Sequence, residues 1–172
     1  MDYMIVDSST LILLAKTGIL DLFIEDRKLN ITKKVKDEVI AEKKTIDSKL
    51  IEQRIKENKI SITEIKDDSF YNKLIKEFNL GKGEAESIVF ALEEKTILLT
   101  DDKKAINICK IFNIKFTTAM NILVKLYQEK KIDKIRAEAI FKKLKKFGRY
   151  SNEIIEKVEE DLKWKKCNLL WP

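Results

Sequence analysis

Histidine is absent from this 172-residue sequence, and no other feature of its composition excludes as much. Without histidine, the chain cannot build a Ser/His/Asp triad, a Cys/His dyad, a histidine-based ribonuclease site or a histidine-ligated zinc centre. Any catalytic site must therefore rely on carboxylates, lysines, hydroxyl groups or a bound metal ion.

Cysteines and long apolar runs are also scarce. The two cysteines, Cys109 and Cys167, have no companions at metal-ligand spacing, which argues against a disulfide framework and a structural zinc site. No segment approaches the roughly 18 uninterrupted apolar residues of a membrane helix. Asp7 interrupts the first apolar stretch, unlike a secretory signal. We therefore expect a cytoplasmic protein with no membrane association.

The distribution of charge divides the chain into two parts. Residues 119–172 contain 14 Lys and Arg against 8 Asp and Glu, whereas residues 1–118 contain 21 of each sign, so the net charge of +6 lies in the last third. The one proline and four glycines form no linker, and we expect the basic part to pack on the same single domain as the neutral part. A basic surface favours an anionic partner such as nucleic acid, although a solvated lysine-rich helix face would show the same excess.

Short apolar strands alternate with helical patterns along the first two thirds of the chain. Strands are predicted at 3–6, 60–65, 96–100 and 114–118, and helices at 10–16, 19–25, 33–42, 47–57, 69–78, 84–94 and 102–112. Three more helices are predicted at 119–130, 134–147 and 151–163. This pattern predicts an α/β fold in which helices cover both faces of a central parallel sheet, followed by C-terminal helices.

Carboxylates directly follow two of the predicted strands. Asp7 follows YMIV, and Asp101 and Asp102 follow TILLT. Ligands bind at the carboxyl ends of parallel strands, so these acids lie at the edge of the sheet where sites are built. A functional role for Asp7 competes with capping of the next helix, for which Ser8 or Ser9 is also available. Asp102 is the stronger candidate of the adjacent pair, since Asp101 is placed to cap the helix at 102–112.

Two further acids are candidates because of their positions on predicted helices. Glu38 lies between Val35 and Val39 and therefore borders an apolar stripe, with a buried salt bridge as the alternative role. GKGEAES at 81–87 places Glu84 in the first turn of a helix, where the helix dipole favours negative charge, so capping is the alternative for this residue. Glu86 points elsewhere on the same helix, toward a second metal ion or solvent.

Four motifs in order resemble those of the PIN-domain ribonucleases. They are VDSSTLI from Val6, VKDEV from Val35, GKGEAESIVFA from Gly81 and LLTDDKKA from Leu98. The set is most similar to the compact prokaryotic branch of VapC-like toxins with a GEAE motif, and residues 140–162 also resemble the C-terminal helical extension of that branch. The resemblance covers nearly the whole chain and implies a three-layer α/β/α fold with a central parallel sheet. Residues 1–118 would form the catalytic core and residues 119–172 the extension.

The resemblance also implies a metal site. It places catalytic acids at Asp7, Glu38, Glu84 and Asp102 that bind Mg²⁺ or Mn²⁺, further candidate ligands at Glu86 and Asp101, and supporting hydroxyls at Ser9 and Thr100. The chain departs from the pattern of many toxins in having T-D-D for T-N-D and Glu for the more usual Asp at position 84. Elementary electrostatics agrees with a metal site, because converging carboxylates repel in a low-dielectric cleft and a hard divalent cation with oxygen ligands removes that conflict.

We therefore predict a divalent-metal-dependent endoribonuclease that hydrolyses phosphodiester bonds in RNA. The candidate RNA-binding residues lie in KKLKKFGR and are Lys142, Lys143, Lys145, Lys146 and Arg149. Phe147 or Tyr150 would stack on a base, unless these aromatic side chains belong to the core.

Two other functions and two further partners follow from the same residues. The chain would be the toxin of a toxin–antitoxin pair if a small antitoxin protein covers the acidic cleft. A non-catalytic RNA-binding or scaffold module with a degenerate site is the alternative. Exposed apolar residues at 19–25 or on the C-terminal helices would support a homodimer, which is frequent in the family that the sequence resembles.

Overall fold

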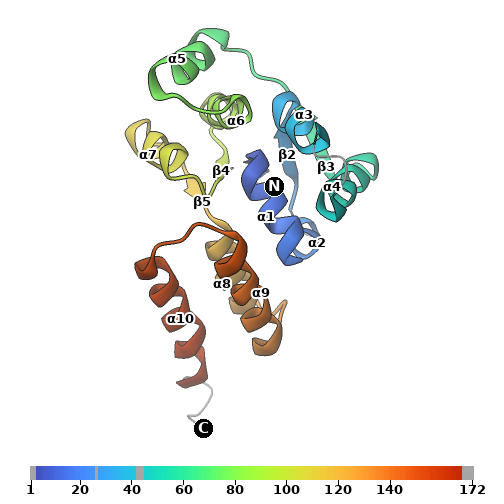
Figure 1. The fold of residues 1–172 in the computed structure, drawn as a ribbon, viewed down its shortest axis with the longest axis vertical. Helices are drawn as coiled ribbons and strands as arrows, with labels where there is room; N and C mark the ends of the chain where they lie inside the picture. Colours follow the sequence, from blue (N-terminus) through green and yellow to red (C-terminus); the bar gives the residue numbers. More distant parts are fainter. Residues whose placement is uncertain (1–2, 26, 42–44, 168–172) are drawn as a thin grey trace.

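Five parallel strands form the centre of the protein in a computed structural model that describes residues 3–25, 27–41 and 45–167, with side chains as far as Leu162. The order across the sheet is β3-β2-β1-β4-β5. The strands are β1 (Met4–Val6), β2 (Leu29–Thr32), β3 (Ile60–Thr63), β4 (Ile97–Leu99) and β5 (Phe116–Thr117). Helices flank the sheet on both faces, which confirms the predicted three-layer α/β/α fold (Figure 1).

Strand β2 is the one strand of this sheet that the sequence pattern does not reveal. Its four residues, LNIT, are too short for a clear alternation, and the next helix begins at Lys33 with no turn residue in between. The strand nevertheless pairs with two neighbours, since Leu29 is opposite both Met4 and Ile60. Strand β1 therefore lies at the centre of the sheet, where the strand order reverses between β1 and β4. Such a reversal is the usual place for a ligand site in a parallel sheet.

The helices divide between two hydrophobic clusters, one on each face of the sheet. The first cluster is covered by α1 (Ser8–Thr17), α2 (Leu20–Ile24), α3 (Lys33–Ala41), α4 (Ile46–Lys56), α8 (Ala119–Gln128), α9 (Lys134–Phe147) and α10 (Asn152–Cys167). The second is covered by α5 (Asp68–Phe78), α6 (Lys82–Glu93) and α7 (Lys103–Ile111). Val6 belongs to the first cluster and Ile5 to the second, because successive strand side chains point to opposite faces.

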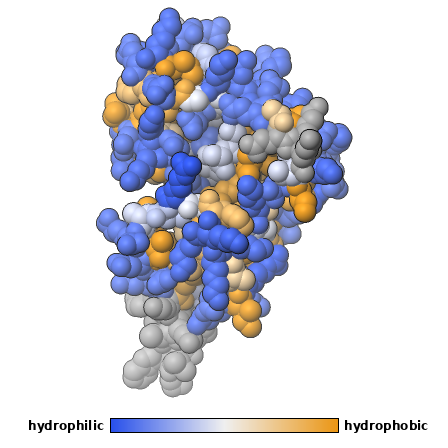
Figure 2. Space-filling view, in the orientation of Figure 1, coloured by the Kyte–Doolittle hydropathy of each residue, from blue (hydrophilic) through white to orange (hydrophobic). Residues whose placement is uncertain are grey.

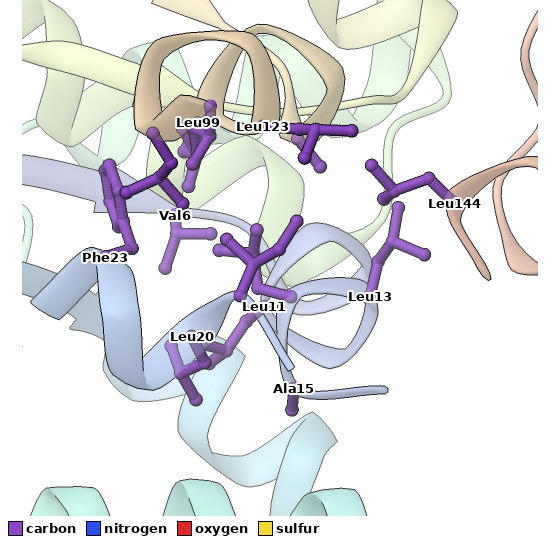
Figure 3. Close-up of a cluster of buried hydrophobic side chains, with 14 of the residues drawn as sticks. Val6, Leu11, Leu13, Ala15, Leu20, Phe23, Leu99, Leu123 and Leu144 are labelled. Carbon is purple, nitrogen blue, oxygen red and sulfur yellow. The ribbon is translucent and has the colours of Figure 1, made fainter. Parts of the chain in front are cut away.

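Apolar side chains from the C-terminal helices join the first cluster. Leu123 of α8 and Leu144 of α9 are fully buried beside Leu13, while Val6 and Leu99 contribute from the strands (Figure 3). Truncating such a buried leucine to alanine costs about 2–5 kcal/mol, so this shared core holds α8 and α9 firmly against the sheet. Helix α10 lies next to α8 at the end of the molecule opposite α5 (Figure 1).

Segment 19–25 does not supply the exposed apolar surface that was expected to support a homodimer. Ile19, Leu20, Phe23 and Ile24 are buried in the first cluster, because α2 packs inward under the sheet. The surface in Figure 2 is mostly hydrophilic, with hydrophobic residues scattered over it. Among the helices that the structure describes, none has the length and apolar character to cross a membrane.

Candidate active site

Asp7 lies at the carboxyl end of β1, where the strand order reverses between β1 and β4, and this part of the sheet edge is called the crevice below. Its backbone N–H donates to the carbonyl oxygen of Leu99, and its side chain caps α1 by accepting a hydrogen bond at Oδ1 from the Thr10 N–H, 2.8 Å away. Of the three capping residues that the sequence offered, Asp7 is therefore the N-cap, and Ser8 and Ser9 are not, since α1 already begins at Ser8. Its other oxygen, Oδ2, is buried and accepts no hydrogen bond from any described residue.

Two adjacent aspartates, Asp101 and Asp102, follow β4 at the same edge of the sheet and have different partners. Asp102 is the N-cap of α7 and accepts at Oδ1 from the N–H groups of Lys104 and Ala105, at 2.8 and 3.0 Å. The expectation that Asp101 caps this helix is therefore wrong by one residue, because α7 begins at Lys103. Asp101 instead accepts from the Ala119 N–H and from the Tyr150 hydroxyl.

Glu38 reaches the crevice from α3 and is held by two other helices. The Ser8 hydroxyl of α1 donates to Oε2 at 2.6 Å, and the Gly83 N–H of α6 donates to Oε1 at 2.9 Å. A Cβ atom on Gly83 would lie 2.5 Å from Oε2, so any larger residue here would displace the carboxylate of Glu38 from its present position. The structure thus brings the VDSST, VKDEV and GKGEAE motifs into contact.

The two glutamates of α6 point in different directions. Glu84 is half-buried and closes a capping box by accepting from the Gly81 N–H at 3.1 Å. Glu86 accepts from the backbone N–H of Lys34 at the start of α3, 3.0 Å away. The side chains of Glu84 and Glu86 therefore point away from each other, as predicted. Of these two glutamates, Glu84 is the one that lies near Asp7, Glu38 and Asp102.

Two acids of the crevice, Asp7 and Glu84, have a raised pKa. Burial raises the pKa of Asp7, and the hydroxyls of Thr100, Thr10 and Ser9 around the carboxylate only partly oppose this rise. Thr100 lies near the Asp7 carboxylate, but Oδ2 has no hydrogen-bond partner among the described residues. Burial also raises the pKa of Glu84, and the negative charges of Asp102, Asp7 and Glu38 raise it further. Glu84 therefore lies close enough to the other three acids to be repelled by each of them.

The donor set of the crevice fits a hard divalent cation. Three carboxylate oxygens accept no hydrogen bond within the described part of the chain, namely Asp7 Oδ2, Glu84 Oε1 and Asp102 Oδ2. In their present rotamers, no three acidic or cysteine side chains among the described residues are arranged to hold a metal ion. Glu84 and Asp102 each use one carboxylate oxygen to cap a helix. Their side chains must therefore change rotamer before the carboxylates can converge on an ion. The observation that favours a bound cation is the buried Oδ2 of Asp7, which has no hydrogen-bond partner among the described residues.

A family model described as a PIN domain matches residues 3–163 of the sequence. The chain belongs to the PIN-domain family. No curated protein matches the sequence. Membership in the family supports a nuclease-type function and the use of divalent metal ions, which agrees with the carboxylate oxygens gathered in the crevice of this PIN domain.

Several residues that shape the site escaped the sequence analysis. Thr10 links two acids, because its N–H donates to Asp7 and its hydroxyl accepts from the Asp101 N–H at 2.9 Å. Gly83 was detectable in principle, since a glycine in the first turn of a helix indicates close approach by another group. Nothing local in the sequence marks Thr10 or Tyr150 as partners of the acids, because both contacts depend on the tertiary fold.

The predicted RNA-binding residues lie at the end of α9 and just beyond it. Lys145 pairs with Glu159 of α10 at 3.1 Å, whereas Lys143 and Lys146 are exposed and have no acidic partner among the described residues. Lys142 is exposed beside the same two helices, and Arg149 is exposed in the following turn. Of the two predicted stacking residues, Phe147 is 48% exposed, while Tyr150 is half-buried with its hydroxyl bound to Asp101.

Proposed function

We propose that this PIN domain is a divalent-metal-dependent endoribonuclease. The observation that supports the proposal most directly is the buried Oδ2 of Asp7, which lacks a hydrogen-bond partner in the described structure and has Glu84 close by. A buried carboxylate oxygen without a partner is costly, and a cation at this position would compensate it. The family supports the nuclease class, and the basic surface on α9 favours a nucleic-acid substrate.

In this proposal, Asp7, Glu38, Glu84 and Asp102 would hold Mg²⁺ or Mn²⁺. Such an ion supplies activation of water and stabilisation of the charge that develops on a phosphodiester. The protein's own contribution is to hold the carboxylates in place. Ser8 and Gly83 fix Glu38 from two sides, and the helix caps fix one oxygen each of Asp7 and Asp102 while leaving the other available.

The toxin role, the small antitoxin and the homodimer stay predictions from the sequence motifs, as does the compact VapC-like branch. Glu86 and Asp101 also stay candidate metal ligands from the sequence motifs alone. In the structure, their carboxylates accept hydrogen bonds from backbone N–H groups at the starts of α3 and α8. The alternative of a non-catalytic RNA-binding module makes a distinct prediction, since a degenerate site would leave Mn²⁺ unbound.

The proposal is tested by titrating the protein calorimetrically with Mn²⁺ and by incubating it with mixed single-stranded and structured RNA. We expect saturable Mn²⁺ binding, endonucleolytic products in Mg²⁺ or Mn²⁺, and no products in excess chelator. RNA binding without Mn²⁺ binding or cleavage would favour the non-catalytic alternative.

The exposed lysines of α9 lead to a prediction about RNA affinity. Replacing Lys143 and Lys146 by glutamine should weaken RNA binding and leave Mn²⁺ binding unchanged, because neither lysine contacts the acids of the crevice. The slope of log affinity against log salt should fall by about 1.4, at about 0.7 per phosphate contact on a single strand. Binding of a fluorescent RNA at several salt concentrations measures this slope.

The matched control replaces Lys16 and Lys49, two exposed lysines on α1 and α4, by glutamine. This variant loses the same net charge but not the proposed surface, so it should keep the wild-type salt slope. Equal changes in both variants would show that the effect comes from net charge and that the end of α9 is a solvated face.

A further inference from the structure

Both oxygens of the Asp101 carboxylate accept hydrogen bonds from the C-terminal helices and the turn between them. The Ala119 N–H at the start of α8 donates to both of its oxygens at 3.2 Å, and the Tyr150 hydroxyl donates to Oδ1 at 2.7 Å. Tyr150 lies between α9 and α10, so this single side chain joins the extension to the end of β4. The arrangement leaves Asp101 beside the site without directing its carboxylate into it.

From Asp101, a short series of hydrogen bonds continues to Asp7. The backbone N–H of Asp101 donates to the Thr10 hydroxyl at 2.9 Å, and the Thr10 N–H donates to Asp7 Oδ1 at 2.8 Å. Thr10 is fully buried, so water does not compete for these bonds. Oδ1 of Asp7 accepts this bond and a second one from the Ser9 hydroxyl at 3.1 Å, whereas Oδ2 has no partner among the described residues.

Gly148 makes room for the ring of Tyr150. Its backbone φ of −89° is open to any residue, so conformation does not require glycine here. A Cβ atom, however, would overlap the Tyr150 ring and lie 2.9 Å from the carbonyl oxygen of Leu144. The same ring packs against the first hydrophobic cluster. Both the turn and the core therefore hold the hydroxyl of Tyr150 at Asp101.

We infer that Tyr150 is a positioning residue through which α9 and α10 set the orientation of the Asp7 carboxylate. Its hydroxyl fixes Asp101, the Asp101 backbone fixes Thr10, and Thr10 fixes Oδ1 of Asp7. The expected effect of Tyr150 on cleavage rests on the proposed nuclease function. The series of hydrogen bonds from Tyr150 to Asp7 does not depend on that function. In this assignment, Asp101 connects the two parts of the chain and is not a metal ligand.

Tyr150→Phe tests the link because it removes the hydroxyl and keeps the ring. The amide hydrogens of Asp101 and Thr10 should exchange with solvent faster, as measured by NMR or mass spectrometry. In the active enzyme, kcat should fall by about tenfold or more at unchanged KM, since misplacing a reacting group by about 1 Å costs up to ~100-fold. Loss of the α9 lysines should instead raise KM, which separates positioning from RNA binding.

Tyr3→Phe is the matched control, because the Tyr3 hydroxyl also binds a carboxylate, Glu94, but just before β1 and away from Asp7. It should leave both exchange rates and kcat unchanged. Gly148→Ala is a second variant that keeps the hydroxyl and displaces the ring, so it should reproduce the effects of Tyr150→Phe.

The outcomes separate this inference from the proposed function. Wild-type exchange at Asp101 and Thr10 in Tyr150→Phe, or wild-type kcat in an active enzyme, would overturn the role of Tyr150. A wild-type protein that neither binds Mn²⁺ nor cleaves RNA would overturn the nuclease proposal, and the exchange rates alone would then decide whether the link exists.

Discussion

Replacing Asp7 by asparagine is expected to abolish nearly all RNA cleavage while the protein stays folded. The amide keeps the shape of the side chain and an acceptor for the Thr10 N–H, so the cap of α1 survives. It removes the negative charge that a cation would need at the buried Oδ2 position. Metal position and water activation both depend on that charge in the proposed mechanism.

Thermal unfolding gives an independent reading of the same variant. In chelator, Asp7→Asn should melt at the wild-type temperature or slightly above it, because burial already disfavours the charged carboxylate and raises its pKa. Saturating Mn²⁺ should stabilise the wild type more than the variant, and an ion at 100 times its Kd contributes about 2.7 kcal/mol.

Melting curves with and without Mn²⁺, together with a cleavage assay, check this prediction. Asp161→Asn on the exposed face of α10 is the control and should behave as the wild type. A variant at Asp7 that still cleaves RNA at the wild-type rate, or gains as much stability from Mn²⁺, would remove Asp7 from the site and with it the main support for a nuclease.

Glu84→Gln should reduce cleavage by about 100-fold or more, whereas Glu86→Gln should keep most of the activity. Glu84 lies among the repelling acids and has an oxygen free of hydrogen bonds from the described residues, so its charge is available to a cation. Glu86 accepts from the Lys34 N–H, and glutamine preserves that acceptor. Both variants should melt near the wild-type temperature in chelator, because glutamine also retains the cap at Gly81.

Cleavage rates at saturating Mn²⁺ compare the two variants directly, and each serves as the control for the other. Equal losses would mean that both glutamates coordinate the ion. A larger loss of cleavage activity in Glu86→Gln than in Glu84→Gln would place the metal ion on the side of α6 that faces α3.

The placement of Asp7, Asp101 and Asp102 was predictable because it follows from local pattern and one rule of parallel sheets. Asp7 directly follows one short apolar strand, Asp101 and Asp102 come two and three residues after another, and all strands of such a sheet end at the same edge. The approach of Glu38 to Glu84 was not deducible from the periodicity of either helix. It depends on how α3 packs against α6 around Gly83. The sequence indicated that Glu38 and Glu84 belong to one site only through the resemblance of the four motifs to those of a known family.

Short elements and single-residue boundaries mark the limit of what the sequence reveals. Strand β2 is stabilised by pairing on both sides, and that pairing involves residues far away in the chain. Asp7 caps its helix in place of Ser8 or Ser9, and Asp102 in place of the expected Asp101, because several polar residues compete at each helix start and packing decides among them. The role of Tyr150 rests on a contact across 49 positions, whereas its sequence context left only base stacking or a place in the core as alternatives.

The central position of β1 has a consequence for how the protein is made. Met4 pairs with Ile97, so strand β1 must wait for a partner strand that is synthesised 93 positions later. Until then, one edge of this apolar strand has no hydrogen-bonding neighbour, and contacts between such distant residues form slowly. Asp7 and Asp102 meet only when β4 has docked. A nascent or truncated chain that ends before Ile97 is therefore prone to aggregate and lacks the assembled acid cluster.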